Sequence, residues 1–296
     1  MSEAQLHYGC PTSTYKFTSP AEDNIELGVL DNIQWNGQLS LVSYGIRIGI
    51  RVNESTVLKE LLNYLPPGWE SSASPIVDEL YSLIMTETLD SCDTHGYYQL
   101  YRNQEKLTET TELGEALATL DSDLRLQIGI AVQDRLFVHA GVVGWQGKAI
   151  VIPGRSFSGK TTLIAALVKA GAIYYSDEYA VLDANGLVHP YARPLSIRQD
   201  EDQGVRRCSV EELGGKAGIE PIPIGMVVHT QYRAGIQWSP TSISAGQAVL
   251  ALLDNTIVAR LRPEFALPIL SRAVADAVCV EGKRGEADET AIALLN

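Results

Sequence analysis

Cysteine is scarce in this chain, with four residues among 296. Cys10, Cys92, Cys208 and Cys279 lie far apart and form no CxxC pair, so neither a zinc site nor a disulfide framework is indicated. Basic residues are also few, because 23 Lys and Arg stand against 36 Asp and Glu, a net charge of −13. That balance argues against nucleic acid and against an anionic membrane surface as partners.

Long apolar runs and internal repeats are absent as well. No apolar stretch reaches the roughly 18 residues that a membrane-spanning helix needs. The opening residues, Met-Ser-Glu-Ala-Gln-Leu-His, lack the basic and apolar regions of a signal peptide. Hydrophobic content of 45% and charged content of 20% are typical of a globular chain with a sizeable core. We therefore expect a cytoplasmic protein with reduced cysteines, and its length predicts about two domains.

A phosphate-binding loop pattern, G-x-x-x-x-G-K-[ST], is matched completely by the sequence Gly-Arg-Ser-Phe-Ser-Gly-Lys-Thr at residues 154–161. In such a loop, backbone N–H groups wrap the phosphates, and the glycines let the backbone approach them closely. Lys160 is expected to reach the β- and γ-phosphates of ATP, and the Thr161 hydroxyl to bind Mg²⁺. The predicted nucleotide-binding residues are Gly154, Arg155, Ser156, Phe157, Ser158, Gly159, Lys160, Thr161 and Thr162.

The segments around the loop have the character that the motif requires. Residues 148–153 form a short apolar run that predicts a buried strand. Residues 161–170 carry Leu163, Leu167 and Ala170 at helical spacing, and Gly171 is a suitable helix end. The order of strand, loop and helix places a bound anion at a helix N-terminus, where the dipole and the free N–H groups both favour it.

Two adjacent acids, Asp177 and Glu178, follow an apolar strand predicted over residues 172–176. A carboxylate beside a phosphate loop can hold Mg²⁺ or accept the proton of an attacking hydroxyl, and two of them can share these tasks. We predict that Asp177 is a metal ligand, and both acids are candidates for the catalytic base. The alternative is that they are surface residues of a solvated turn.

His139 ends an apolar segment that precedes the loop strand. A single histidine in such a position is most often structural. Its strand is expected to pair with the loop strand, which would bring His139 near the γ-phosphate, so it is also a catalytic candidate. One or two of four later arginines are candidates for neutralising charge on the transferred group. These are Arg193, Arg198, Arg206 and Arg207.

Other segments predict the rest of the secondary structure. We expect a polar, irregular arm over about the first 20 residues, and a domain boundary near residues 125–135. Helices are predicted at 56–65, 112–132, 244–253 and 266–278, and strands at 45–52, 75–85, 97–101, 136–143, 179–182 and 222–231. Asn185-Gly186 predicts a hairpin turn.

The order of His139, the phosphate loop, Gly171 and the acid pair resembles the catalytic domain of the HPr serine kinase/phosphorylase family. The resemblance covers about residues 139–181, and more loosely the rest of the chain to its end. It implies an α/β fold, namely a P-loop kinase domain of the HPr kinase/PEP carboxykinase-like type with a mixed sheet. We place that domain at residues 129–296, preceded by a smaller α+β region at 1–128 that would bind a substrate or partner.

The resemblance also implies roles for individual residues. Lys160 would bind phosphate, Thr161 would ligate Mg²⁺, and His139 would lie close to the reacting phosphoryl group. In the family the second acid is an aspartate that acts as general base. This chain has Glu178 there, so either Glu178 is a reshaped base or Asp177 takes that role. The family's signature stretch has no counterpart in residues 199–204, which makes the chain more similar to divergent members that phosphorylate peptides.

These observations predict an ATP- and Mg²⁺-dependent kinase that phosphorylates a hydroxyl, of Ser or Thr, on a peptide or small protein. Two alternatives stay open. One keeps the site and changes the acceptor to a small metabolite, and the other is a non-enzymatic nucleotide-binding module that regulates a partner. Analogy with the family also allows a homo-oligomer.

Overall fold

The structure is a computed structural model that describes residues 30, 32–90, 93–154, 158–198 and 205–296. The protein is of the mixed α/β class, and its chain divides into two compact units, Met1–Asp123 and Leu124–Asn296. The division lies inside the helix α2 (Leu113–Ala131), whereas the sequence analysis placed it between residues 128 and 129. The irregular arm expected at the start of the chain lies outside the described residues.

The first unit is built on one sheet. Its strands are β1 (Gly37–Ser43), β2 (Ile46–Val52), β3 (Glu70–Ser71), β4 (Glu79–Asp90), β5 (Asp93–Arg102) and β6 (Glu105–Thr110). In the described residues their order is β3-β1-β2-β4-β5-β6. β2 and β4 run parallel, and the other neighbouring strands run antiparallel. Ile48, Ile50 and Val52 are buried at alternate positions of β2, which agrees with the alternating pattern of that segment.

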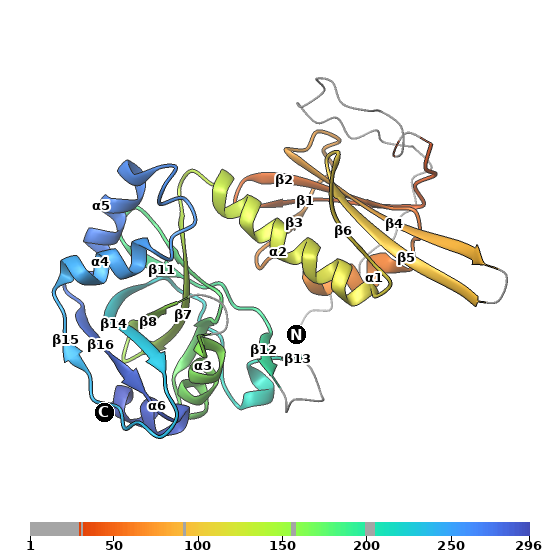
Figure 1. Ribbon diagram of the computed structural model, residues 1–296. Coiled ribbons are helices and arrows are strands. Elements are labelled where there is room, and N and C mark those ends of the chain that lie inside the picture. Colours follow the sequence, from red (N-terminus) through yellow and green to blue (C-terminus); the bar gives the residue numbers. More distant parts are fainter. Residues whose placement is uncertain (1–29, 31, 91–92, 155–157, 199–204) are drawn as a thin grey trace. The chain divides into compact units, whose positions relative to one another are not determined.

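Helices cover one face of this sheet. They are α1 (Val57–Leu61), continued by the 3₁₀ turn η1 (Leu62–Tyr64), and the first part of α2. Figure 1 shows α2 running across the sheet of the first unit. Leu117 and Leu120 of α2 are fully buried, and so is Tyr81 of β4. Burial of each such large apolar side chain stabilises the fold by about 1.5–3 kcal/mol.

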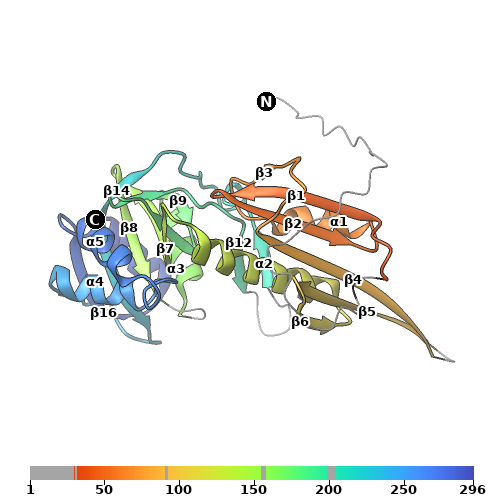
Figure 2. The ribbon, with the colours of Figure 1, turned by 90° about the horizontal axis from the view of Figure 1, so that it is seen from above.

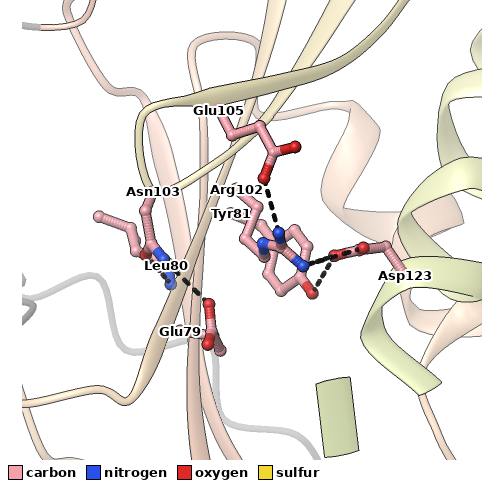
Figure 3. Close-up of polar contacts among 7 residues, drawn as sticks. All are labelled: Glu79, Leu80, Tyr81, Arg102, Asn103, Glu105 and Asp123. Carbon is pink, nitrogen blue, oxygen red and sulfur yellow. Dashed lines mark hydrogen bonds and ion pairs between the residues drawn. The ribbon is translucent and has the colours of Figure 1, made fainter. Parts of the chain in front are cut away.

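Polar contacts also join α2 to the sheet (Figure 3). Asp123 accepts a hydrogen bond of 2.8 Å from the Tyr81 hydroxyl and one of 3.1 Å from Arg102 Nη1. Arg102 Nη2 donates to Glu105 Oε2 at 2.6 Å. Burial, together with the charge of Asp123, raises the pKa of Tyr81, so the phenol remains a protonated donor. These bonds fix the helix on the sheet, and they pair the charge of Arg102 with those of Asp123 and Glu105.

A second contact set stabilises the turn between β5 and β6. Asn103 has a positive φ of 53°, a conformation that asparagine tolerates better than most residues. Its side chain accepts from the backbone N–H of Leu80 at 3.1 Å and donates to Glu79 Oε2 at 3.0 Å. The turn is thereby bonded to the start of β4 (Figure 3).

The second unit is built on a mixed sheet. Its strands are β7 (Leu136–Trp145), β8 (Lys148–Pro153), β9 (Ile173–Ser176), β10 (Tyr179–Leu182), β11 (Leu187–His189), β14 (Ile222–Tyr232), β15 (Thr241–Ser242) and β16 (Val278–Arg284). Their order is β11-β10-β7-β8-β14-β16-β15, and β9 also pairs with β7. β14 runs parallel to both β8 and β16, while β7 runs antiparallel to β8, β9 and β10. A separate hairpin consists of β12 (Leu195–Arg198) and β13 (Val205–Cys208).

Helices cover both faces of the second sheet. They are α3 (Lys160–Lys169), α4 (Ala245–Leu253), α5 (Pro263–Ala273) and α6 (Ala287–Leu295), and a 3₁₀ turn, η2, spans Glu211–Leu213. α4 and α5 pack on one face, and α3 and α6 pack on the other (Figures 1 and 2). Strand β8 is buried on both sides. Ala149 and Val151 belong to the core beneath α4 and α5, and Ile150 and Ile152 belong to the core beneath α3 and α6. This double burial explains the continuous apolar run of β8.

Most elements predicted around the loop are confirmed, and the helix predicted near the chain end is present with different bounds. The predicted strand at 148–153, the strand at 222–231 and the helix at 244–253 correspond to β8, β14 and α4. The helix predicted at 266–278 instead spans Pro263–Ala273, because Pro263 favours the first turn of a helix. Val278 begins β16, where it pairs with Met226 of β14. In the described part of the chain, no helix combines the length and apolar character needed to cross a membrane.

Candidate functional site

The predicted order of strand, loop and helix is present in the second unit. β8 ends at Pro153, and α3 begins at Lys160, with Gly159 as its N-cap in the left-handed region at φ 82°. Gly154 and Ser158–Thr162 are described, whereas Arg155, Ser156 and Phe157 lie outside the described residues. The first N–H groups of α3 have no acceptor within the helix and are therefore available to an anion.

Lys160 is buried at the base of the loop. Its side chain is only 7% exposed, and its Nζ donates to the carbonyl oxygen of Gly154 at 2.7 Å. Burial lowers the pKa of Lys160, and the charges of Glu178 and Asp177 oppose that shift. The ammonium group thus folds back onto the loop, at the point where the motif places phosphate. Thr162 follows in the first turn of α3 with an exposed side chain.

Asp177 faces the first turn of α3 and is buried. Its Oδ2 accepts a hydrogen bond of 3.0 Å from the Thr161 hydroxyl, and its Oδ1 accepts one of 2.9 Å from the Tyr174 hydroxyl. Among the described residues, no cationic side chain forms an ion pair with this carboxylate. Burial raises the pKa of Asp177, against the hydrogen bonds from Tyr174 and Thr161. The two metal ligands predicted from the sequence, Thr161 and Asp177, are therefore in direct contact.

Glu178 lies in a different environment from its neighbour. Its Oε1 is 2.7 Å from Arg125 Nη1 and 3.3 Å from His139 Nε2. The side chain is 30% exposed, so solvent can reach it. Arg125 is not among the residues predicted from the sequence, because a cation inside a helical pattern carries no signal of a distant acidic partner.

His139 is mostly buried between Glu178 and the ring of Tyr179. The centroids of the two rings are 5.1 Å apart. Burial lowers the pKa of His139, although the charge of Glu178 opposes the shift, so the imidazole is neutral at neutral pH. Its Nδ1 is buried and has no hydrogen-bond partner among the residues that the structure describes. An orphaned buried nitrogen of this kind is uncommon and marks a place where a ligand or water can bind.

Strand β7 brings the loop and the acid pair together. His139 pairs with Tyr179 of β10, and the next residue of β7, Ala140, pairs with Pro153 of β8. The carbonyl of His139 accepts from Gly154 N–H at 3.2 Å, and Ala140 N–H donates to the carbonyl of Glu178 at 3.1 Å. The loop and the acid pair, more than 15 residues apart in sequence, thus bond to two consecutive residues of β7.

The two acids form a bend between β9 and β10. Ser176 Oγ accepts hydrogen bonds from the backbone N–H groups of Glu178 and Tyr179, at 3.0 and 2.9 Å. β9 and β10 run in the same direction, both antiparallel to β7, and a bend at Asp177 and Glu178 interrupts them. Asp177 contacts α3, while Glu178 contacts His139. A hydroxyl that accepts two backbone hydrogen bonds fixes the bend and with it both carboxylates.

Two of the four arginines considered from the sequence have contacts that place them. Arg206 forms an ion pair with Glu212 at the surface. The carbonyl of Arg193 accepts from the Tyr174 hydroxyl at 2.9 Å, which places its backbone behind Asp177. Residues 199–204, where the family signature was sought, lie outside the described residues.

Replacing Asp177 by asparagine is expected to stabilise the protein without nucleotide. Folding raises the pKa of Asp177, so the protonated carboxyl group favours the folded state. This contribution to stability is complete below the unfolded pKa of about 3.9, and it is lost as the pH rises through the folded pKa. At pH 7 the buried charge is therefore unfavourable. We expect Asp177→Asn to raise the midpoint of thermal unfolding by about 2–4 °C at pH 7, with a smaller gain toward pH 4.

Asp183 provides a matched control for that experiment. Although burial opposes the shift, hydrogen bonds from His189 and from backbone N–H groups lower the pKa of Asp183. Its charge stabilises the fold above the unfolded pKa, so Asp183→Asn should lower the midpoint at pH 7. A lower midpoint for Asp177→Asn as well would mean that the bonds to Tyr174 and Thr161 outweigh the desolvation of the carboxylate.

Comparison with other proteins adds no assignment to this site. Within the described residues, no group of three or more His, Cys, Asp or Glu side chains is arranged to hold a metal ion. No model of a known protein family matches the sequence, and no curated protein matches it.

Proposed function

We propose that the protein is an ATP- and Mg²⁺-dependent kinase that transfers the γ-phosphoryl group to a Ser or Thr hydroxyl of a peptide or small protein. The observation that carries the proposal is the convergence of Lys160, the Thr161–Asp177 pair and the His139–Glu178 pair around one loop. A phosphate loop alone supports nucleotide binding. A partly exposed carboxylate beside it adds a group that can take a proton from an acceptor.

Asp177 is the better of the two acids for Mg²⁺. The donor set fits this ion, since Mg²⁺ prefers oxygen ligands and is usually held by one or two protein groups together with substrate phosphates and water. Thr161 Oγ1 and Asp177 Oδ2 would hold it, and the buried carboxylate has no cationic side chain paired with it among the described residues. When bound, the ion would neutralise charge on the β- and γ-phosphates.

Glu178 is the better of the two acids for the base. Asp177 uses both carboxylate oxygens in hydrogen bonds to Thr161 and Tyr174, whereas Glu178 is engaged through Oε1. In the described residues, Oε2 of Glu178 forms no hydrogen bond, so it is the atom that would accept the proton of the attacking hydroxyl. Arg125 fixes the orientation of the carboxylate, and the neutral His139 lies beside it.

The remaining parts of the proposal rest on the resemblance to the HPr kinase family. We assign the second unit to the P-loop kinase domain of the HPr kinase/PEP carboxykinase-like type. The mixed sheet supports this assignment, with a parallel strand on one side of β8 and the antiparallel β7 on the other. The first unit would recognise the acceptor or a partner. Glu178 stands where the family has an aspartate, and its side chain is one methylene longer. Arg125 holds its carboxylate in place.

Incubation with γ-labelled ATP and Mg²⁺ tests the proposal. We expect label to appear on Ser or Thr of an added peptide library or of a co-purifying protein. Label that appears only on a small hydroxyl compound would replace the peptide acceptor by a metabolite. Tight binding of ATP without transfer to any acceptor would contradict the kinase and favour a regulatory nucleotide-binding module.

A further inference from the structure

An arginine outside the loop motif, Arg284, is buried beside the phosphate loop in the second unit. Arg284 is the last residue of β16 and is 2% exposed. Its Nη2 donates to the carbonyl oxygen of Gly159 at 2.9 Å, and its Nη1 donates to that of Gly285 at 3.0 Å. Both acceptors are neutral backbone atoms, so these bonds orient the guanidinium without cancelling its charge.

In the described residues, no carboxylate forms an ion pair with Arg284. The ring of Tyr232 covers the guanidinium, with its centroid 5.3 Å from the central carbon. The nearby Glu286 instead accepts from the Tyr232 hydroxyl at 3.2 Å. Burial lowers the pKa of Arg284, against the effects of Tyr232 and Glu286. Buried charges in proteins are almost always paired, because an isolated one is costly to desolvate.

The backbone around Arg284 is held tightly. The N–H of Arg233 donates to the Arg284 carbonyl at 2.8 Å, and Arg284 pairs with Tyr232 in the parallel ladder of β14 and β16. A Cβ at Gly285 would lie 1.9 Å from the carbonyl oxygen of Ile236, so only glycine fits there. The side chain of Arg284 therefore reaches Gly159 from a fixed position.

The contact with Gly159 sets the direction of the next N–H group. The carbonyl of Gly159 and the N–H of Lys160 belong to one trans peptide, in which they point in opposite directions. Since Arg284 binds that carbonyl, and Leu163 N–H also donates to it at 3.2 Å, the N–H of Lys160 is turned away from Arg284. A Cβ at residue 159 would lie 2.6 Å from Nη2, which gives this position a second reason to be glycine besides its φ of 82°.

We propose that Arg284 is a positioning residue for nucleotide phosphates: it fixes the Gly159–Lys160 peptide, and its charge is completed by the phosphate groups of a bound nucleoside di- or triphosphate. The inference rests on the proposed function, because it assigns a further residue to the same phosphate site. Arg284 touches the loop and not the substrate. Its charge acts across a low-dielectric interior, where screening by water is weak.

Nucleotide binding by Arg284→Gln and Arg284→Lys tests this inference. Titration calorimetry with ADP, AMP and adenosine separates phosphate recognition from base recognition. We expect Arg284→Gln to bind ADP about 10–100-fold more weakly and adenosine unchanged, since the glutamine amide keeps a donor but loses the charge. Arg284→Lys keeps the charge and should lie within about 10-fold of the wild type.

Thermal unfolding of the same variants separates this role from a purely structural one. Without nucleotide, Arg284→Gln should unfold at or above the wild-type midpoint, because a buried unpaired charge has been removed. With ADP, its midpoint should rise less than that of the wild type. Arg272→Gln is a matched control, since Arg272 also donates to a backbone carbonyl, that of Ala184, but lies on α5.

Three outcomes would overturn the inference. They are ADP binding by Arg284→Gln within about twofold of the wild type, equal losses for ADP and adenosine, and a nucleotide-free midpoint well below that of the wild type. If Arg284→Gln does not fold, equal losses of ADP and adenosine binding in Arg284→Lys would have the same meaning. A wild-type protein that binds neither ADP nor ATP would instead defeat the proposed function, and this inference with it.

Discussion

Replacing Lys160 by alanine is expected to abolish phosphoryl transfer and to weaken ATP binding by at least about 100-fold, close to 3 kcal/mol. Lys160 is the cation at the base of the loop, bonded to the Gly154 carbonyl and buried. In the nucleotide complex it would exchange that carbonyl for phosphate oxygens. The loss should therefore be large for ATP and ADP and small for adenosine, as measured by titration calorimetry.

The same substitution should not unfold the protein. Burial lowers the pKa of Lys160, which means that the fold does not favour its charge. A nucleotide-free midpoint of unfolding equal to or above that of the wild type is therefore expected. Lys169→Ala, an exposed lysine in the last turn of the same helix, is the control and should bind ATP normally. Unchanged ATP binding in Lys160→Ala would remove the phosphate loop as the nucleotide site.

Replacing Glu178 by glutamine is expected to lower the rate of transfer by about 10²–10⁴-fold, the usual contribution of a positioned general base. Glutamine keeps the size of the side chain and can still bond to Arg125, but it cannot take a proton. ATP affinity should stay within about threefold of the wild type, because Glu178 lies beside His139 and does not bond to the loop. Initial rates with labelled ATP, together with titration of ATP, measure both quantities.

Two further variants sharpen the result for Glu178. Glu178→Asp shortens the side chain by one methylene and draws the carboxylate away from Arg125 and His139, so we expect an intermediate rate. Glu289→Gln, at an exposed position in the first turn of α6, is the control and should be fully active. Transfer by Glu178→Gln at the wild-type rate, with Asp177→Asn inactive, would give the role of base to Asp177.

The sequence predicts the part of the site that depends on local chain properties. The glycines of the loop, the apolar run of β8 and the helical spacing in α3 are readable because neighbouring residues determine them. The sequence could not separate Asp177 from Glu178. Their environments differ because Ser176 fixes a bend between β9 and β10, where one carboxylate contacts Thr161 and the other contacts Arg125.

The elements near the chain end were harder to predict for a different reason. β16 exists because it pairs with β14, so a segment of mixed polarity became a strand through a distant partner. The role of Arg284 follows from the same pairing. A single arginine far along the chain from the loop carries no periodic or motif signal, and its contact with Gly159 is visible only once β16 is in place.

Strand β7 has a consequence for the energetics of the site as a whole. His139 and Ala140 hold both Gly154 of the loop and Glu178 of the acid pair through backbone bonds. Local opening of this strand would release the two together, so they belong to one cooperative unit. Under the proposed function, free energy that a nucleotide contributes at the loop would then be shared by the acid pair, and nucleotide binding would rigidify the place where the acceptor reacts.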